Sequence, residues 1–278
     1  MLEIEKIPSF ISPSALMQAM TQPNTFYLTR LLNERDPREP QSLAASVGSA
    51  FDYYIKVELM AEKFKHKAGL LPQLKNGIEG NNIEAHQVGK RALGFYKMGA
   101  YDIDEIHDVE IHTNGSVEGV PLYGMLDAST WDEEYDLEVP FDWKVSGYTS
   151  KTGVSPKPGF YRLWEGNRPK TSHKKYFKGI PFDAIDPKWA LQLCTYGWIT
   201  GIPLGKEFPG YIDMLCWRKN KVRTAKYRGI ITEEFQENTA REYKRLWDDL
   251  LTGNFIDRIA SKTDIEFVWH ASTKESWF

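Results

Sequence analysis

The chain has 278 residues, of which 41% are hydrophobic, and a formal net charge of -3 at pH 7. A chain of this size can bury one large core or two modest ones, and we expect a single domain over residues 1–278. No apolar run approaches the roughly 18 residues of a membrane span, and the N-terminus has no basic-then-apolar signal, so we expect a soluble, cytoplasmic protein. The two cysteines, Cys194 and Cys216, lack the spacing of a disulfide framework or a metal cluster.

The first half of the chain is predicted to be mainly helical. Ser12 and Pro13 are a typical N-cap and first-turn residue, so a short helix should begin there and end at Pro23. Apolar residues at a spacing of four predict the next helix. These residues are Val47, Phe51, Ile55 and Leu59. The predicted helices cover about residues 44–63 and 84–98. Residues 24–45 should form a loop or short helical pieces, and residues 64–83, rich in helix-breaking residues, a surface loop.

The second half alternates strand-like and helical patterns. Glu133 and Glu134 lie in a polar stretch that predicts a hairpin between two strands. A helix should begin at Asp186-Pro187, and a last one is capped by Thr232 and stopped by Gly253. Strands are predicted over 106–113, 117–130, 135–144, 210–219 and 221–231, with a long loop over 145–182. This order predicts an α/β fold with a mixed central sheet flanked by helices. The core should cover about 44–231, and a helical extension 232–278.

Charge is strongly segregated along the chain. Between residues 98 and 143 there are 13 acidic residues and no lysine or arginine, whereas residues 145–182 contain a single acid, Glu165. The eight basic residues of that second stretch are Lys151, Lys157, Arg162, Arg168, Lys170, Lys174, Lys175 and Lys178. Such a pattern suits a site where carboxylates hold a cation and basic side chains hold a polyanion. Two solvated faces of opposite charge would explain it equally well.

The tripeptide Asp142-Trp143-Lys144 lies where the charge changes sign. With 38 acidic residues and 23 lysines, an acid two residues before a lysine should occur about three times by chance, and it occurs three times. Its position on a strand is more informative, because Asp142 and Lys144 then share one face while Trp143 points to the other, which can be core.

The predicted hairpin brings a second carboxylate to this face. It should place Asp127 opposite residue 140 and diagonal to Asp142, and Pro140 indicates either a bulge or a strand edge at that point. Two such carboxylates could share Mg²⁺ or Mn²⁺, and a nearby lysine suits phosphodiester hydrolysis. An ordinary ion pair at a strand edge is the alternative.

Four stretches in this order resemble the PD-(D/E)XK nuclease superfamily, above all its RecB-like and CRISPR-associated exonuclease branch and the similar recombination exonucleases of phages. The stretches are GSAFDYYIK, EIHTNGSVEGVPLYGMLDAS, EVPFDWKVSG and QLCTY. They correspond to a helix, a strand ending in Asp, an acid-x-Lys strand and a Gln-x-x-x-Tyr helix, over about residues 12–200. The resemblance implies a metal-dependent deoxyribonuclease with a sheet between helices.

The resemblance also implies roles for individual residues. Asp127 and Asp142 would bind the metal together with the backbone carbonyl of Trp143, and Lys144 would assist the attacking water. Gln192 and Tyr196 would reach the same phosphate or support the lysine, although a core tyrosine with a glutamine at its rim is also open.

Three further features bear on the metal site. Related enzymes often carry an acid at the position of Glu110 that helps order the site, so the resemblance makes Glu110 a candidate metal ligand. Asp52 stands where the family often has histidine, so it is either a carboxylate ligand or no ligand. Gln22-Pro23 replaces the Cys-Pro of relatives that carry an iron–sulfur cluster, so we expect no such cluster.

The function implied is a Mg²⁺- or Mn²⁺-dependent DNA exonuclease acting in recombination or DNA end processing. The eight basic residues would follow the DNA backbone, and nearby aromatic residues would stack on unpaired bases. These aromatic residues are Tyr161, Trp164, Tyr176 and Phe177. A catalytically inactive nucleic-acid-binding protein on the same fold, and an α/β protein that binds a partner through the basic loop, are the alternatives. The sequence leaves open cleavage polarity, strand preference, a recombination protein as partner and a homo-oligomer.

Overall fold

Side-chain caps mark where helices of this chain begin. The carboxylate of Asp186 accepts a hydrogen bond from the amide of Trp189 at 3.0 Å, and the hydroxyl of Thr232 accepts one from Phe235 at 3.3 Å. Caps of this kind satisfy amides that the first helical turn leaves without partners. Both helices therefore start where the sequence predicts them.

The computed structural model describes residues 7–34, 42–70, 83–99, 104–147, 161–162, 164–165, 168–169, 180–218 and 221–255. The helices are α1 (Pro13–Thr21), α2 (Pro23–Phe26), the π-helical turn η1 (Tyr27–Leu31), α3 (Leu43–Glu62), the 3₁₀ segment η2 (Lys65–Leu70), α5 (Ile83–Gly99), α6 (Phe182–Ile185), α7 (Pro187–Ile199) and α8 (Glu233–Thr252). The strands are β1 (Ile106–Val117), β2 (Val120–Asp132), β3 (Leu137–Gly147), β4 (Tyr161–Arg162), β5 (Trp164–Glu165), β6 (Arg168–Pro169), β7 (Phe208–Arg218) and β8 (Lys221–Ile231). Within these described residues, no helix has the length and apolar character to cross a membrane.

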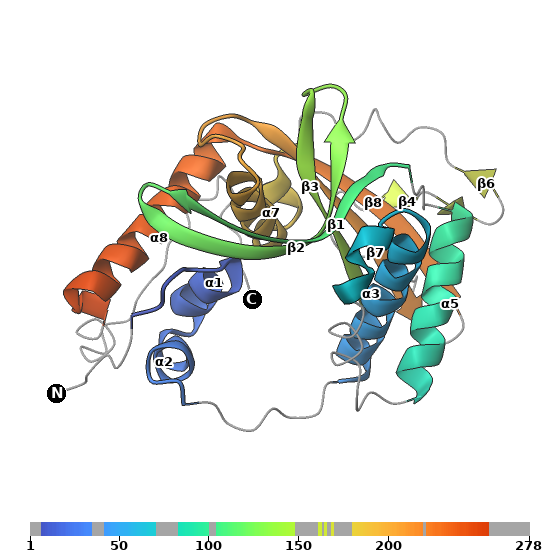
Figure 1. Ribbon diagram of the computed structural model, residues 1–278, viewed down its shortest axis with the longest axis horizontal. Helices are drawn as coiled ribbons and strands as arrows, with labels where there is room; N and C mark the ends of the chain where they lie inside the picture. Colours follow the sequence, from blue (N-terminus) through green and yellow to red (C-terminus); the bar gives the residue numbers. More distant parts are fainter. Residues whose placement is uncertain are drawn as a thin grey trace.

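Six of the described strands form a mixed sheet in the order β1-β2-β3-β7-β8-β4 (Figure 1), and β5 and β6 form a separate two-stranded sheet. The pairs β1–β2, β2–β3, β7–β8 and β8–β4 are antiparallel, whereas β3 and β7 are parallel. A parallel pair needs a crossover connection, and here the crossover contains α6 and α7. The predicted α/β fold with a mixed sheet is confirmed.

Helices cover both faces of the sheet and enclose two main hydrophobic clusters. In the first cluster, residues of α1, α7 and α8, such as Leu193 and Tyr243, pack on the sheet. In the second, α3 and α5 pack against β3 through residues such as Phe51 and Tyr96. Figure 1 shows α3 and α5 side by side, away from α1, α7 and α8. Strand β3 therefore runs between two helical layers, and its alternate side chains face different environments.

The structure corrects one predicted strand and one predicted loop. The stretch 117–130 was predicted as one strand, but Glu118 and Gly119 form a tight turn between β1 and β2 with φ angles of 50° and 75°. Positive φ at both turn positions matches the right-handed twist of the two strands. The stretch 145–182 was predicted as a loop, but β3 extends to Gly147 and the described parts beyond it include β4, β5 and β6.

Pro140 does not produce a bulge. It pairs with Ser129 in the β2–β3 ladder, and the register is continuous on both sides of it. The parallel pairing with β7 begins only at Phe141. Pro140 therefore lies just before the segment of β3 that pairs with strands on both sides. Within that segment a proline, which has no amide hydrogen, would remove a hydrogen bond of the ladder.

Candidate active site

Alternation along β3 separates the polar and apolar residues of the tripeptide. Phe141 and Trp143 are buried in the second cluster with α3 and α5. Asp142 is 1% exposed, and its Oδ2 lies 2.5 Å from Nζ of Lys144. The predicted arrangement of this strand is confirmed, with Asp142 and Lys144 together and the aromatic side chains in the core.

The register of β2 and β3 differs from the prediction. The paired residues run from Asp132 and Leu137 to Ala128 and Phe141, so the next step brings Asp127 level with Asp142. The prediction had placed them diagonally. The four-residue turn lies further along the chain than predicted, because β2 continues to Asp132, whose Oδ1 accepts hydrogen bonds from two turn amides at 2.9 Å each. Asp127 and Asp142 are therefore direct neighbours.

The two carboxyl groups are close enough for each to shift the pKa of the other. When Asp142 is ionised, neither of its oxygens receives a hydrogen bond from the described groups, and Lys144 is its ion-pair partner. Burial, together with the neighbouring Asp127, raises the pKa of Asp142 well above its ordinary value, although Lys144 opposes this. An ionised Asp142 is thus costly in the protein alone and is favoured by a cation.

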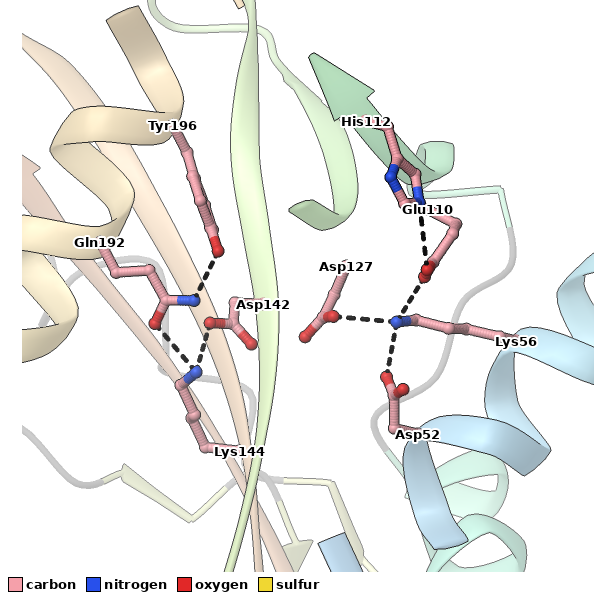
Figure 2. A network of polar contacts seen from close by, with 9 residues as sticks. All are labelled: Asp52, Lys56, Glu110, His112, Asp127, Asp142, Lys144, Gln192 and Tyr196. Atoms are coloured by element: carbon pink, nitrogen blue, oxygen red, sulfur yellow. Dashed lines mark hydrogen bonds and ion pairs between the residues drawn. The ribbon is translucent and has the colours of Figure 1, made fainter. Parts of the chain in front are cut away.

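Helix α7 supplies the polar groups that hold Lys144 (Figure 2). Nζ of Lys144 donates to Oε1 of Gln192 at 3.0 Å, and Nε2 of Gln192 donates to the hydroxyl of Tyr196 at 3.0 Å. Gln192 and Tyr196 are one helical turn apart and project from the same face. Burial raises the pKa of Tyr196, so this hydroxyl stays protonated. The structure brings together Asp142, Lys144, Gln192 and Tyr196, as the resemblance implied.

A second lysine approaches from the opposite side. Nζ of Lys56 on α3 lies 2.9 Å from Asp52, 2.6 Å from Glu110 and 3.0 Å from Oδ1 of Asp127. Figure 2 shows Asp127 between this group and the group around Lys144. Lys56 is 1% exposed. The carboxylates predicted to surround a metal are therefore arranged around an ammonium group on this side.

Glu110 has a backbone conformation that is rare for residues other than glycine. Its φ is 51°, in the middle of β1 and level with Asp127 on β2. Just before it in β1, Val109 packs in the second cluster with Ala128, whereas Leu126 packs in the first. The β1–β2 hairpin thus passes from one core to the other at this point. Such strain is found where the surroundings hold a functional side chain in place.

The charges around Lys56 shift the pKa values of its partners. Partial burial raises the pKa of Asp127, but Lys56, the hydrogen bond from Asp142 and Lys144 outweigh it and lower the value to about 2. Burial and the negative charge of Asp127 raise the pKa of Asp52 to about 7, against the effect of Lys56. Burial lowers the pKa of Lys56, but the three neighbouring carboxylates raise it by more than burial lowers it. The pKa of Lys56 therefore lies above its ordinary value, and the ammonium stays charged.

A buried hydrogen-bond network connects β3 to α5 and β7 on the face of the sheet opposite Asp142 and Lys144. The indole Nε1 of Trp143 donates to the hydroxyl of Tyr96 at 3.1 Å, and Tyr96 in turn donates to Asp213. Asp213 is the residue of β7 that pairs with Trp143. This network fixes the Trp143 side chain, and with it the backbone between Asp142 and Lys144. The Trp143 carbonyl stays a predicted ligand.

Comparison with known proteins gives a likeness of fold. No family model matches the chain, and a search of curated proteins finds no match. The crystal structure of the "Putative exonuclease" of Eubacterium rectale matches 88% of this chain and 82% of its own, with 13% identity and a TM-score of 0.52. The two chains share a fold. The structure of SSO0001 matches 86% of this chain and 84% of its own at 13% identity, but its TM-score of 0.29 carries no weight.

Most of the predicted DNA-binding residues lie outside the described residues. These are Lys151, Lys157, Lys170, Lys174, Lys175 and Lys178. Arg162 is in β4, which pairs with β8 at the edge of the sheet, and Arg168 is in β6, which pairs with β5. Backbone pairing thus places these two arginines within short strands.

Sequence analysis missed two residues of the site. Lys56 is four residues after Asp52, so the helical period already placed both on one face, next to the apolar stripe of α3. His112 lies 3.4 Å from Glu110 and hydrogen-bonds with the hydroxyl of Tyr123. The strand period places His112 on the same face as Glu110, although nothing in the sequence linked this face to Lys56.

The residues at this site fit one hard cation. Among the described residues, no group of three or more His, Cys, Asp and Glu side chains is arranged to hold a metal ion. Three carboxylates contact Lys56, whereas Asp142 is buried beside the partly exposed Asp127 and accepts no hydrogen bond from the described residues. Carboxylate oxygens of this kind suit Mg²⁺ or Mn²⁺.

Proposed function

We propose that this protein is a Mg²⁺- or Mn²⁺-dependent DNA exonuclease that hydrolyses phosphodiester bonds in recombination or DNA end processing. The observation that carries the proposal is the position of Asp142, a buried carboxylate that accepts no hydrogen bond from described groups and lies beside Asp127 and 2.5 Å from Lys144. The fold shared with the Eubacterium rectale protein agrees with it.

The metal would be held by Asp127 and Asp142, with the Trp143 carbonyl as a further ligand. A bound Mg²⁺ or Mn²⁺ polarises the phosphoryl group and lowers the pKa of a bound water. The negative charge that a buried Asp142 must carry is otherwise unfavourable, so ionisation of this residue and cation binding support each other.

Lys144 has the geometry to act on the reacting groups. Lys144 forms an ion pair with Asp142 and donates a hydrogen bond to Gln192, and its remaining N–H groups can donate to the attacking water or to a phosphate oxygen. The side chain is 28% exposed, so it borders solvent, where the DNA would lie. A fixed positive charge at this position offsets the negative charge that develops on the phosphate.

Gln192 and Tyr196 would orient Lys144. Gln192 uses its oxygen for Lys144 and its amide nitrogen for Tyr196, so its orientation is determined at both ends. The hydroxyl of Tyr196 keeps a proton to donate toward the DNA. The basic residues of 145–182, Arg162 and Arg168 among them, would neutralise DNA phosphates, and DNA affinity should then fall steeply with salt.

A second candidate is a nucleic-acid-binding protein without catalytic activity. The observation that favours it is Lys56, which already neutralises Asp127 and leaves no three-ligand group among the described residues. The two functions differ in their need for metal, because binding through basic residues does not require a divalent ion.

Incubation of linear and closed circular DNA with Mg²⁺, with Mn²⁺ and with a chelator distinguishes the candidates. An exonuclease shortens only the linear DNA, and only with metal. A binding protein retards both DNA forms on a gel and cleaves neither. Cleavage of the circular form would replace the exonuclease assignment by an endonuclease, and chelator-resistant cleavage would contradict the metal site.

A further inference from the structure

The ion pairs of the site fall into two sets that meet at Asp127. Lys144 forms an ion pair with Asp142, whereas Lys56 forms ion pairs with Asp52, Glu110 and Asp127. The three carboxylates around Lys56 come from three separate elements, α3, β1 and β2. The ammonium group of Lys56 donates a hydrogen bond to Asp127 at 3.0 Å and lies within ion-pair distance of Asp52 and Glu110, at 2.9 and 2.6 Å.

We propose that Lys56 is a built-in cation that takes the place of a second divalent ion, so that this site binds one metal ion only. The inference rests on the proposed function and specifies its metal content. It gives Asp52 and Glu110 the role of holding Lys56, where the sequence had suggested metal ligands. Lys56 would be a positioning residue, since it acts on the metal through Asp127.

Charge balance supports a single ion. With its groups ionised, the site contains four carboxylates, Asp52, Glu110, Asp127 and Asp142, and two ammonium groups, Lys56 and Lys144. Four negative and two positive charges leave a net charge of -2, which one divalent ion neutralises. A second ion would leave an excess of two positive charges, which is costly in a partly buried site.

The position of Lys56 makes its displacement by a metal unfavourable. It is buried and belongs to the same helix as Asp52, one turn away. Ile55 and Leu59 on α3 are completely buried in the second cluster, which anchors this part of the helix. A metal ion in the three-carboxylate position would leave a buried ammonium without partners, which proteins avoid.

Lys56 contacts only one of the two carboxylate oxygens of Asp127. Oδ1 of Asp127 contacts Lys56, and Figure 2 shows the other oxygen on the side of Asp142. This leaves one oxygen of Asp127 directed toward the place where the proposed metal would be shared with Asp142. Lys56 would thereby fix the orientation of a ligand before any metal binds.

The test is the number of Mn²⁺ ions bound per chain without DNA, measured by calorimetry and by electron paramagnetic resonance of free Mn²⁺. The wild-type chain should bind one ion. Lys56→Met keeps the length and removes the charge, so it should open the three-carboxylate position and bind two. Lys97→Met is a matched control, because Lys97 is exposed on α5 and pairs with Glu58 away from the site. It should bind one ion.

Glu110→Gln gives an independent answer if Lys56→Met fails to fold. If Glu110 holds Lys56, this variant should still bind one ion with an affinity within about tenfold of wild type, whereas Asp127→Asn should lose it. Two ions in the wild-type chain, or loss of the ion in Glu110→Gln, would overturn the inference and leave the nuclease proposal standing. No Mn²⁺ binding by the wild-type chain would overturn both.

Discussion

Asp127 and Asp142 lie level with each other on neighbouring strands, and each shifts the pKa of the other. Each has its own lysine, Lys56 for Asp127 and Lys144 for Asp142. Their pKa values are shifted in opposite directions, down to about 2 for Asp127 and well above the ordinary value for Asp142. The pair therefore carries one stable negative charge and one that depends on a cation. This asymmetry determines most of the behaviour expected of the site.

Lys144→Ala should reduce DNA cleavage by about 10²–10³-fold or more, because it removes the positive charge closest to Asp142 and the donor to the water or phosphate. Binding of DNA in the presence of chelator should change little. Degradation rates of end-labelled linear DNA and gel retardation measure the two effects. Lys244→Ala, which removes an exposed lysine of α8, is the control and should leave both unchanged. Wild-type cleavage by Lys144→Ala would remove this residue from the mechanism.

Asp142→Asn should stabilise the protein while abolishing its response to metal. Burial disfavours the ionised carboxylate, so the neutral amide should raise the metal-free stability by about 1–2 kcal/mol at neutral pH. Mg²⁺ should raise the melting temperature of wild type but not that of the variant. Thermal denaturation with and without Mg²⁺ gives both results. Asp248→Asn, at an exposed ion pair of α8, should behave as wild type, and a metal-dependent shift in Asp142→Asn would contradict the ligand assignment.

Metal-free stability should fall as pH rises through the range set by Asp52. Its pKa is raised from 3.8 to about 7, so between these values the folded protein holds a proton that the unfolded chain has lost. The stability that this proton contributes is present at low pH and is lost as pH rises through about 7. Asp52→Asn should therefore show a smaller difference in melting temperature between about pH 5 and pH 8 than wild type. The effect should be moderate, because the side chain is 34% exposed. An unchanged pH difference in the variant would exclude Asp52 as its source.

Gln192→Leu should lower the rate of cleavage by about 10–100-fold, since Lys144 loses the acceptor that orients it. Tyr196→Phe should have a smaller effect, because it removes only the hydroxyl that holds the far end of Gln192. Turnover at saturating DNA and Mg²⁺ tests this order. A larger loss in Tyr196→Phe than in Gln192→Leu would indicate that the hydroxyl acts on the DNA directly.

Gly124→Ala should destabilise the protein by about 1–3 kcal/mol through overpacking. A Cβ at this position of β2 would lie 2.4 Å from Ile199 and 2.9 Å from the ring of Tyr196. Cleavage should fall as well, because α7 must move away from the site. Gly94→Ala on α5 is the matched control, since its Cβ would meet nothing within 4 Å. That change should stabilise by about 0.5–1 kcal/mol. Urea denaturation measures both, and equal stability of the two variants would contradict the close approach of β2 and α7.

Local sequence signals predicted three of the helices and the alternation of side chains along β3. The caps at Asp186 and Thr232 and the apolar stripe of α3 predicted helices, because a capped, amphipathic segment satisfies its own amides wherever it lies. The alternation of Asp142, Trp143 and Lys144 predicted which side chains share a face, because the period of a strand is fixed. These inferences need no knowledge of distant residues.

The tertiary structure alone decided how these parts meet. The position of the turn after Asp132 made Asp127 the direct neighbour of Asp142, and register depends on turn geometry that the sequence pattern did not specify. Lys56 meets carboxylates from β1 and β2 only because α3 packs against that end of the sheet. On an isolated helix, the ammonium group of Lys56 would face water. Burial among residues distant in the sequence turned it into part of the site.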